Sequence, residues 1–187
     1  MSKNEELRIG VLGNVDSGKT TTISVLAHTI LDNGRGLARK KVLRHDHEKE
    51  SGRTSSITHT YYKTDLSDDD DDKKTRIISF VDLAGHEKYY KTTIFGANSC
   101  SLDYIMLLIG GNMGVSLMTR EHFLLALILK VPFIVVITKI DMAPKKVLEQ
   151  TVNDITKLLK RYKPDHHFVE VTNDNKNVLN KKDCNNQ

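Results

Sequence analysis

Short apolar segments alternate with amphipathic ones along this chain. An apolar run at 7–12 precedes a glycine-bounded loop and a segment of helical spacing at 20–31, which predicts a strand, a loop and a helix. We expect Gly34 and Gly36 to end that helix. Residues 37–56 carry many charges and little periodicity, so they predict a long, mobile loop.

Two segments rich in β-branched and aromatic residues follow, at 57–66 and 75–81, with five consecutive aspartates between them. The aspartates repel one another too strongly to pack, so we expect an antiparallel hairpin with an acidic tip. The pattern then predicts helices at 86–98, 118–130 and 145–162, and strands at 104–109, 133–138 and 168–171. Apolar strands separated by helices are typical of a parallel sheet covered on both faces.

Composition narrows the class of protein. With 187 residues, 39% hydrophobic and 28% charged, the chain suits a single soluble domain over residues 1–187. Residues 172–187 form a polar tail, and the sequence leaves open whether the domain stops before its last strand and helix. No apolar run approaches the ~18 residues of a membrane span, and two cysteines make no disulfide framework, so we expect a monomer in the reducing cytoplasm.

Charge is unevenly distributed, although the formal net charge is only +4. Acidic residues cluster at 68–72, whereas basic residues cluster at 35–44 and 157–163. One interpretation is that the acidic and basic clusters lie on two solvent-exposed faces of the protein. The alternative is an electrostatic footprint for RNA or a ribosome-like partner.

The strongest chemical signal is Gly13-Asn-Val-Asp-Ser-Gly-Lys-Thr20, which fits G-x-x-x-x-G-K-[ST] between a predicted strand and helix. Backbone N–H groups and the helix N-terminus of such a loop hold a polyanion. Lys19 would add a positive charge at the β- and γ-phosphates, and the Thr20 hydroxyl would ligate Mg²⁺. A purely structural turn would not require this lysine. The predicted nucleotide-binding residues here are Gly13, Asn14, Val15, Asp16, Ser17, Gly18, Lys19, Thr20 and Thr21.

Two further motifs end apolar strands. Asp82-Leu-Ala-Gly85 would place Asp82 near the Mg²⁺ of Thr20, holding the metal through water. Gly85 would let the backbone approach the γ-phosphate; read alone, it is equally well a turn glycine after a strand.

The segment Thr138-Lys-Ile-Asp141 predicts guanine recognition. The Asp141 carboxylate accepts hydrogen bonds from the N1–H and N2–H₂ groups of guanine, whereas adenine would leave it partly unpaired. The stem of Lys139 can lie over the base. Because it also ends a strand, this segment belongs to the same edge of the sheet.

Together these motifs, in this order, resemble the GTPase domain of the translational, elongation factor Tu-like superfamily. Residues 52–56, 78–93 and 136–144 are similar to its GTP-binding protein 1 subgroup. The resemblance covers about residues 7–162. It implies a Ras-like α/β P-loop GTPase fold, a three-layer sandwich with one antiparallel strand in a mostly parallel sheet of order 2-3-1-4-5-6 if the last strand forms.

The resemblance also implies residue roles. His86 matches the histidine that orients the attacking water; the alternative is a surface histidine capping the next helix. Thr54 matches the switch threonine that closes over Mg²⁺ and the γ-phosphate only in the GTP state, although from the residues alone Ser55 and Ser56 are equal candidates. Asp16 resembles an aspartate that helps to bind K⁺ or Na⁺.

Some positions depart from the family pattern. Thr138 replaces the usual asparagine and loses an amide that ties the base to the phosphate loop, so we expect lower affinity. A fifth guanine-contact motif is not clear, and 171–173 is the nearest candidate. No arginine in the chain is assigned to stabilise the transition state, so unassisted turnover should be slow and stimulated by a partner such as a ribosome.

We therefore expect a Mg²⁺-dependent GTPase, a hydrolase acting on the β–γ phosphoanhydride of GTP, that switches through loops near 34–60 and 82–98. The expected partners are GTP and GDP, a ribosome or RNA, and an exchange or activating factor. The alternatives are a regulatory module that binds both nucleotides with negligible hydrolysis and an RNA-binding protein driven by the basic stretches.

Overall fold

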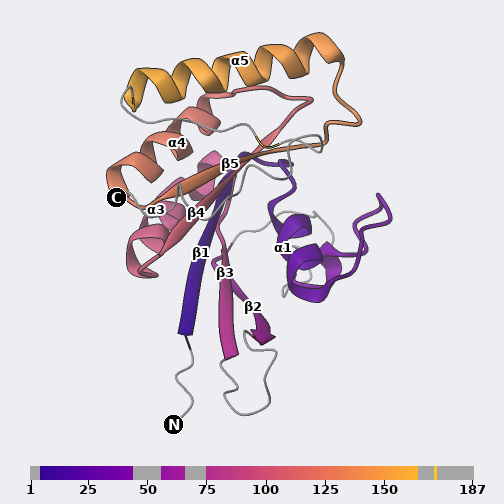
Figure 1. Cartoon of the computed structure of the whole chain (residues 1–187), viewed down its shortest axis with the longest axis vertical. Helices are drawn as coiled ribbons and strands as arrows, with labels where there is room; N and C mark the ends of the chain where they lie inside the picture. Colours follow the sequence, from indigo (N-terminus) through magenta and orange to yellow (C-terminus); the bar gives the residue numbers. More distant parts are fainter. Residues whose placement is uncertain (1–4, 44–55, 66–74, 164–170, 172–187) are drawn as a thin grey trace. The chain divides into compact units, whose positions relative to one another are not determined.

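The computed structural model describes residues 5–43, 56–65, 75–163 and 171. Within them a five-stranded sheet has the order β2-β3-β1-β4-β5 (Figure 1). The pairs β1–β3, β1–β4 and β4–β5 are parallel, and β2–β3 is antiparallel. This confirms the predicted sheet, with one antiparallel strand. The strands are β1 (Glu5–Gly13), β2 (Thr58–Asp65), β3 (Thr75–Asp82), β4 (Tyr104–Gly110) and β5 (Phe133–Thr138).

Helices alternate with the parallel strands along the chain, as the apolar pattern predicts. None of those described is long and apolar enough to cross a membrane. The chain divides into two compact units, residues 1–151 and 152–187, and the predicted nucleotide-binding motifs lie in the first. The helices are α1 (Lys19–His28), α3 (Tyr90–Ser99), α4 (Leu117–Leu129) and α5 (Lys145–Tyr162), with short 3₁₀ turns η1 (Arg39–Lys41) and η2 (Glu87–Tyr89).

Both faces of the central strands are buried. On one face Val11, Phe80 and Leu108 form a cluster with Ile23 of α1. Because successive residues of a strand point to opposite faces, the equally buried Leu12 belongs to the other face, and α4 contacts β1 and β4. Figure 1 shows α1 on one side of the sheet and α3 and α4 on the other, which is the three-layer arrangement that the sequence predicts.

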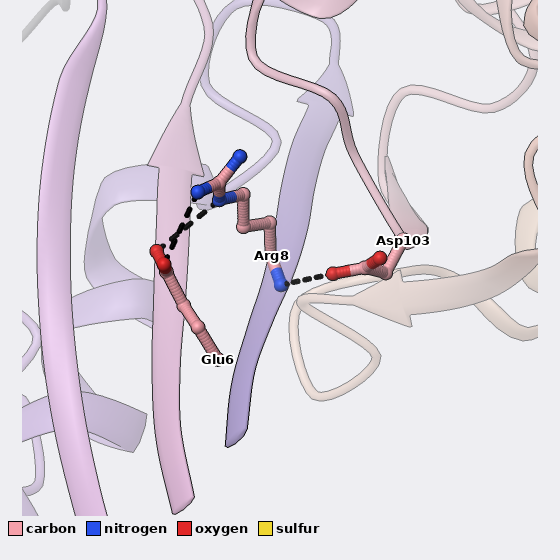
Figure 2. Close-up of polar contacts among 3 residues, drawn as sticks. All are labelled: Glu6, Arg8 and Asp103. Atoms are coloured by element: carbon pink, nitrogen blue, oxygen red, sulfur yellow. Dashed lines mark hydrogen bonds and ion pairs between the residues drawn. The ribbon is translucent and has the colours of Figure 1, made fainter. Parts of the chain in front are cut away.

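Two hydrogen bonds between Arg8 and Asp103 set the register between β1 and β4 (Figure 2). The Arg8 N–H donates to the Asp103 carboxylate at 2.7 Å, and the Asp103 N–H donates to the Arg8 carbonyl at 2.9 Å. The ladder continues with Ile9 opposite Tyr104. The Arg8 guanidinium forms an exposed ion pair with Glu6, a kind of contact that contributes little to stability. Asp103 therefore helps to fix which residues reach the carboxyl end of the sheet.

The first helix is shorter than the sequence predicts. It ends at His28, not at Leu31, because Thr29 takes a left-handed conformation with φ of 55°. The Thr29 N–H donates to the Val25 carbonyl at 2.9 Å, as in a helix C-terminal turn. The expectation that Gly34 and Gly36 end the helix is therefore wrong.

The segment expected to be a long, mobile loop is partly packed. Residues 39–41 form η1, and Ala38, Val42 and Leu43 are buried. The Ser24 hydroxyl donates to the Ala38 carbonyl at 2.5 Å, which anchors this segment to α1. Other expectations lie outside the described residues: the loop at 44–55 with Thr54, the acidic tip at 68–72, and most of the predicted last strand at 168–171.

A histidine on α4 is buried in the protein interior, where the charge of Lys19 acts on it. His122 of α4 is fully buried, with its ring 5.7 Å from that of Tyr90. Burial, and then the positive charge of Lys19, lower the pKa of His122 from 6.5 to about 4. The folded protein therefore keeps this imidazole neutral at a pH where the unfolded chain would protonate it.

Stability should consequently depend on pH through His122. Its full contribution is present above pH 6.5 and is lost as the pH falls toward about 4, at a cost of roughly 3 kcal/mol in the free energy of unfolding. Urea unfolding at several pH values should show a shallower acid loss for His122→Gln than for the wild type. His28→Gln, at an exposed position, should keep the wild-type slope; an equal slope in all three proteins would contradict the assignment.

Candidate functional site

A cavity of about 480 Å³ opens at the carboxyl ends of the parallel strands. Three segments predicted to bind a nucleotide line it together: the phosphate loop at 13–20, the pair Gly85 and His86, and the base motif at 138–141. A fourth segment, at 32–39, was not predicted. The lining residues are Val15, Asp16, Gly18, Lys19, Thr20, Thr21, Thr22, Asp32, Gly34, Gly36, Arg39, Gly85, His86, Thr138, Lys139, Asp141 and Met142.

Lys19 is the buried cation of this cavity. Its side chain is only 7% exposed, and its Nζ donates to the carbonyls of Gly13 and Asn14 at 2.9 Å each. Desolvation lowers the pKa of Lys19, while the charges of Asp82 and Asp16 raise it. The ammonium group is therefore held under the loop by two carbonyl dipoles and stabilised by neighbouring carboxylates, an arrangement suited to a bound polyanion.

Asn14 and Ser17 hold the phosphate loop and do not line the cavity. The Asn14 side chain accepts from the Val15 N–H at 2.7 Å and donates to the Ser116 hydroxyl at 3.1 Å. That hydroxyl also accepts from the Thr119 N–H at 3.1 Å, which caps α4. The buried Ser17 hydroxyl donates to the Asn14 carbonyl at 2.8 Å. Their side chains shape the loop, so any contact of theirs with a nucleotide would come from the backbone.

Thr20 lines the cavity and is bonded to Asp82, which is not itself a lining residue. The Thr20 hydroxyl donates to the Asp82 carboxylate at 2.6 Å, and Asp82 is fully buried. A hydroxyl and a carboxylate are oxygen ligands that suit Mg²⁺, which in phosphate sites is held by one or two protein groups with the phosphates and water. These residues therefore fit a magnesium ion.

Gly85 packs directly against the phosphate loop. A Cβ atom at this position would lie 2.3 Å from Lys19 Nζ and 2.5 Å from the Gly13 carbonyl oxygen, distances that no side chain allows. The glycine therefore permits the close approach of backbone to the phosphate-binding groups.

His86 lines the cavity but also makes a structural contact. Its Nδ1 accepts from the Lys88 N–H at 3.1 Å and caps η2. This is the capping arrangement that the sequence left open as an alternative. With Nδ1 as acceptor, a neutral ring carries its proton on Nε2, so the other edge of the ring is a donor that can bind a water molecule.

The base motif follows β5 directly. Thr138 is the last residue of β5 and the first of the motif, and Lys139 then takes a left-handed conformation with φ of 55°. The Met142 N–H donates to the Lys139 carbonyl at 3.2 Å, which closes a turn. Lys139 and Asp141 thereby reach the cavity wall on the loop that follows the strand.

Comparison with known proteins identifies the family. A sequence model described as "Elongation factor Tu GTP binding domain" matches residues 4–180, which include every motif of the cavity. The chain belongs to this family. It is therefore a GTP-binding domain of the translation-factor type, and the resemblance inferred from the motifs is confirmed.

Curated relatives agree with this assignment. GTP-binding protein 1 of Xenopus laevis is 47% identical over 171 residues, which cover 83% of this chain and 26% of that protein. GTP-binding protein 2 of Homo sapiens is 45% identical over 168 residues, covering 83% and 28%. The chain thus spans about a quarter of the length of the curated relatives that it matches.

Solved structures agree on the fold. A bacterial selenocysteine-specific elongation factor superposes with a TM-score of 0.67 at 25% identity, over 88% of this chain and 25% of that one. Elongation factor SelB from Methanococcus maripaludis, solved with the GTP analogue GppNHp, gives 0.61 at 23% identity, over 84% and 27%. The elongation factor Tu-type domain therefore has the predicted Ras-like P-loop fold.

Thr138 ties the base motif to the phosphate loop. Its hydroxyl donates to the Ser17 carbonyl at 2.8 Å, and its own carbonyl accepts from the Gly111 N–H at 2.8 Å. The asparagine amide is absent, as expected, but the threonine hydroxyl supplies a contact of its own between the two motifs. The lower affinity inferred from that loss is therefore not required by the geometry.

Sequence reasoning missed Thr22, Met142 and the cavity-lining position of the loop at 32–39, of which it assigned residues from 34 onward only to a switch loop. The loop carries a readable signal, an aspartate followed by an asparagine and two glycines, which is typical of a side-chain-capped turn. Nothing in the sequence alone shows that such a turn reaches the cavity. The predicted metal ligand Thr54 lies outside the described residues.

Replacing Thr138 with valine should speed the release of GDP. The change keeps the shape of the side chain but leaves the Ser17 carbonyl without its donor, and a net hydrogen bond of ~0.5–1.5 kcal/mol corresponds to a roughly 2- to 10-fold faster dissociation. Stopped-flow chase of a fluorescent GDP analogue measures this rate. Thr138→Ser should retain the wild-type rate. A valine variant that releases GDP as slowly as the wild type would show that the tie has no energetic role.

Proposed function

We propose that this domain binds GTP together with Mg²⁺ and hydrolyses the β–γ phosphoanhydride. Its loops near 34–60 and 82–98 would change conformation between the GTP and GDP states. The observation that carries the proposal is a cavity lined by the buried Lys19, by Asp141 and by Thr20, whose hydroxyl is bonded to the Asp82 carboxylate. Each group corresponds to one part of the ligand: phosphates, metal ion and base.

The protein's own groups would act mainly by positioning and by charge. Lys19 would turn from the two loop carbonyls toward the phosphates and stabilise the charge that develops on them. Thr20 and Asp82 would hold Mg²⁺, with Thr54 completing the set in the GTP state; the ion would neutralise charge on the β- and γ-phosphates. Attack of water on the γ-phosphorus would break its bond to the bridging oxygen and release GDP and phosphate.

His86 would orient the attacking water through Nε2. Its Nδ1 already caps η2, and this cap would fix the direction of the ring. The same contact also supports a second candidate function, a regulatory module that binds GTP and GDP with negligible hydrolysis. In that case the histidine would be a helix cap only.

The proposal extends to a monovalent cation, to the extent of the domain and to its partners. Asp16, with φ of 58° at the cavity wall, would help to bind K⁺ or Na⁺. We propose residues 1–187 as one GTP-binding domain, monomeric and cytoplasmic, whose turnover is accelerated by a ribosome, an RNA or another activating factor. Nucleotide exchange would involve a further partner.

Nucleotide selectivity and turnover test the proposal directly. Purified chain should bind a fluorescent GDP analogue that GTP and GDP displace and ATP does not, and chelation of Mg²⁺ should weaken the binding. Slow phosphate release from GTP, on the order of 10⁻² s⁻¹ or less, would support the hydrolase. Binding without release would favour the regulatory module, and the absence of guanine preference would refute both.

Substitution of His86 separates catalysis from capping. His86→Ala removes both functions, whereas His86→Asn keeps a capping acceptor but does not reach as far. If His86 orients water, single-turnover phosphate release should fall about 100-fold in both variants, with GDP affinity changed less than threefold. Wild-type turnover in the asparagine variant would leave His86 with the capping role alone.

A further inference from the structure

Arg39 lies in the wall of the nucleotide cavity, although its neighbours in the basic stretch do not. Arg35, Lys40 and Lys41 are exposed and are absent from the cavity lining, whereas Arg39 is half-buried and belongs to it. The described part of the basic stretch is therefore not uniform: Arg39 lines the cavity proposed for the nucleotide, and the other three cations are exposed.

The loop before Arg39 is held in a defined shape. The Asp32 carboxylate accepts from the N–H groups of Gly34 at 3.1 Å, Gly36 at 3.4 Å and Ala38 at 2.9 Å. These hydrogen bonds, led by that of Ala38, lower the pKa of Asp32. Ala38 is fully buried, and its carbonyl is bonded to Ser24 of α1. The backbone that carries Arg39 is thus anchored immediately before it.

The Arg39 guanidinium group packs directly against Gly36. A Cβ atom at Gly36 would lie 2.4 Å from Arg39 Nε and 2.9 Å from its Cζ. Gly36 is buried and has φ of 81°, a conformation that other residues rarely adopt. The side chain of Arg39 therefore folds back over its own loop, where it lines the cavity.

This positive charge has no carboxylate partner at ion-pair distance among the described residues. Asp32, on the same loop, interacts with the charge of Arg39 but already accepts three backbone hydrogen bonds. Lys19, on the opposite element of the cavity, is buried and bound to carbonyls. A guanidinium group matches the paired oxygens of a phosphate group and binds it more specifically than an ammonium group does.

We propose that Arg39 is a phosphate-binding residue of the nucleotide site, contacting the phosphates of GDP and GTP alike. The inference rests on the proposed nucleotide binding and adds to it a cation supplied by the segment that begins the first switch loop. The proposal also removes Arg39 from the residues that would bind RNA under the alternative hypothesis for the basic stretch. A cation that binds the nucleotide contributes to RNA affinity only indirectly.

Competition against a fluorescent GDP analogue tests this role. Arg39→Ala should raise the dissociation constant for GDP about tenfold, and Arg39→Lys should recover part of that loss. Arg35→Ala removes an exposed arginine of the same loop and should stay within twofold of the wild type. If Arg39→Ala binds GDP as tightly as Arg35→Ala and the wild type do, Arg39 has no role in binding.

The ligand series identifies the group that Arg39 contacts. Guanosine affinity should be the same in Arg39→Ala and the wild type, while GMP and GDP affinities should both fall. An equal loss for guanosine would show that Arg39 supports the loop or the base and would overturn the proposal. Wild-type protein that binds no guanine nucleotide would refute the proposed function itself, so the two failures remain distinct. Thermal melting of both variants checks that they fold.

Discussion

The site depends on the register of the parallel strands. In this register Val11 of β1 lies opposite Asp82 of β3, and Gly110 of β4 lies opposite Thr138 of β5. A parallel sheet brings the carboxyl ends of all its strands to one edge. The phosphate loop, Asp82 and the base motif therefore meet although they are far apart in the sequence. A shift of one residue in either pairing would turn Asp82 or Thr138 to the other face.

Local structure alone does not hold the phosphate loop. Three polar contacts fix it from distant segments: Thr20 to Asp82, Asn14 to Ser116, and Ser17 to Thr138. Each joins a loop residue to a segment that begins or ends at the same edge of the sheet. A glycine-rich loop loses much conformational entropy on ordering, and these contacts offset that loss. The loop should therefore become ordered only when the sheet is assembled.

The sequence predicts the fold well because its elements are strongly periodic. The strand Phe133–Thr138 and the helix Lys145–Tyr162 have the predicted bounds, and the motif spacing indicates the family. Prediction from the sequence fails where the backbone conformation of a single residue decides where a helix ends, as at Thr29. It also fails where burial depends on tertiary contacts, as in the loop that carries Arg39. The motifs name the site residues, but they do not show that Asn14 is bound to Ser116 or that the Thr138 hydroxyl reaches Ser17.

The two ends of the cavity differ in how firmly they are held. At the base end, Thr138 is bonded to the phosphate loop by its side chain and to Gly111 by its backbone, so the base and phosphate sites are mechanically joined. At the other end, His86 is held by its cap on a short 3₁₀ turn and by an edge contact with the Tyr89 ring of the same turn. Such a turn has few hydrogen bonds to break. In the proposed hydrolysis, rearrangement of the cavity would therefore be easiest at His86, while Thr138 would keep the base motif joined to the phosphate loop.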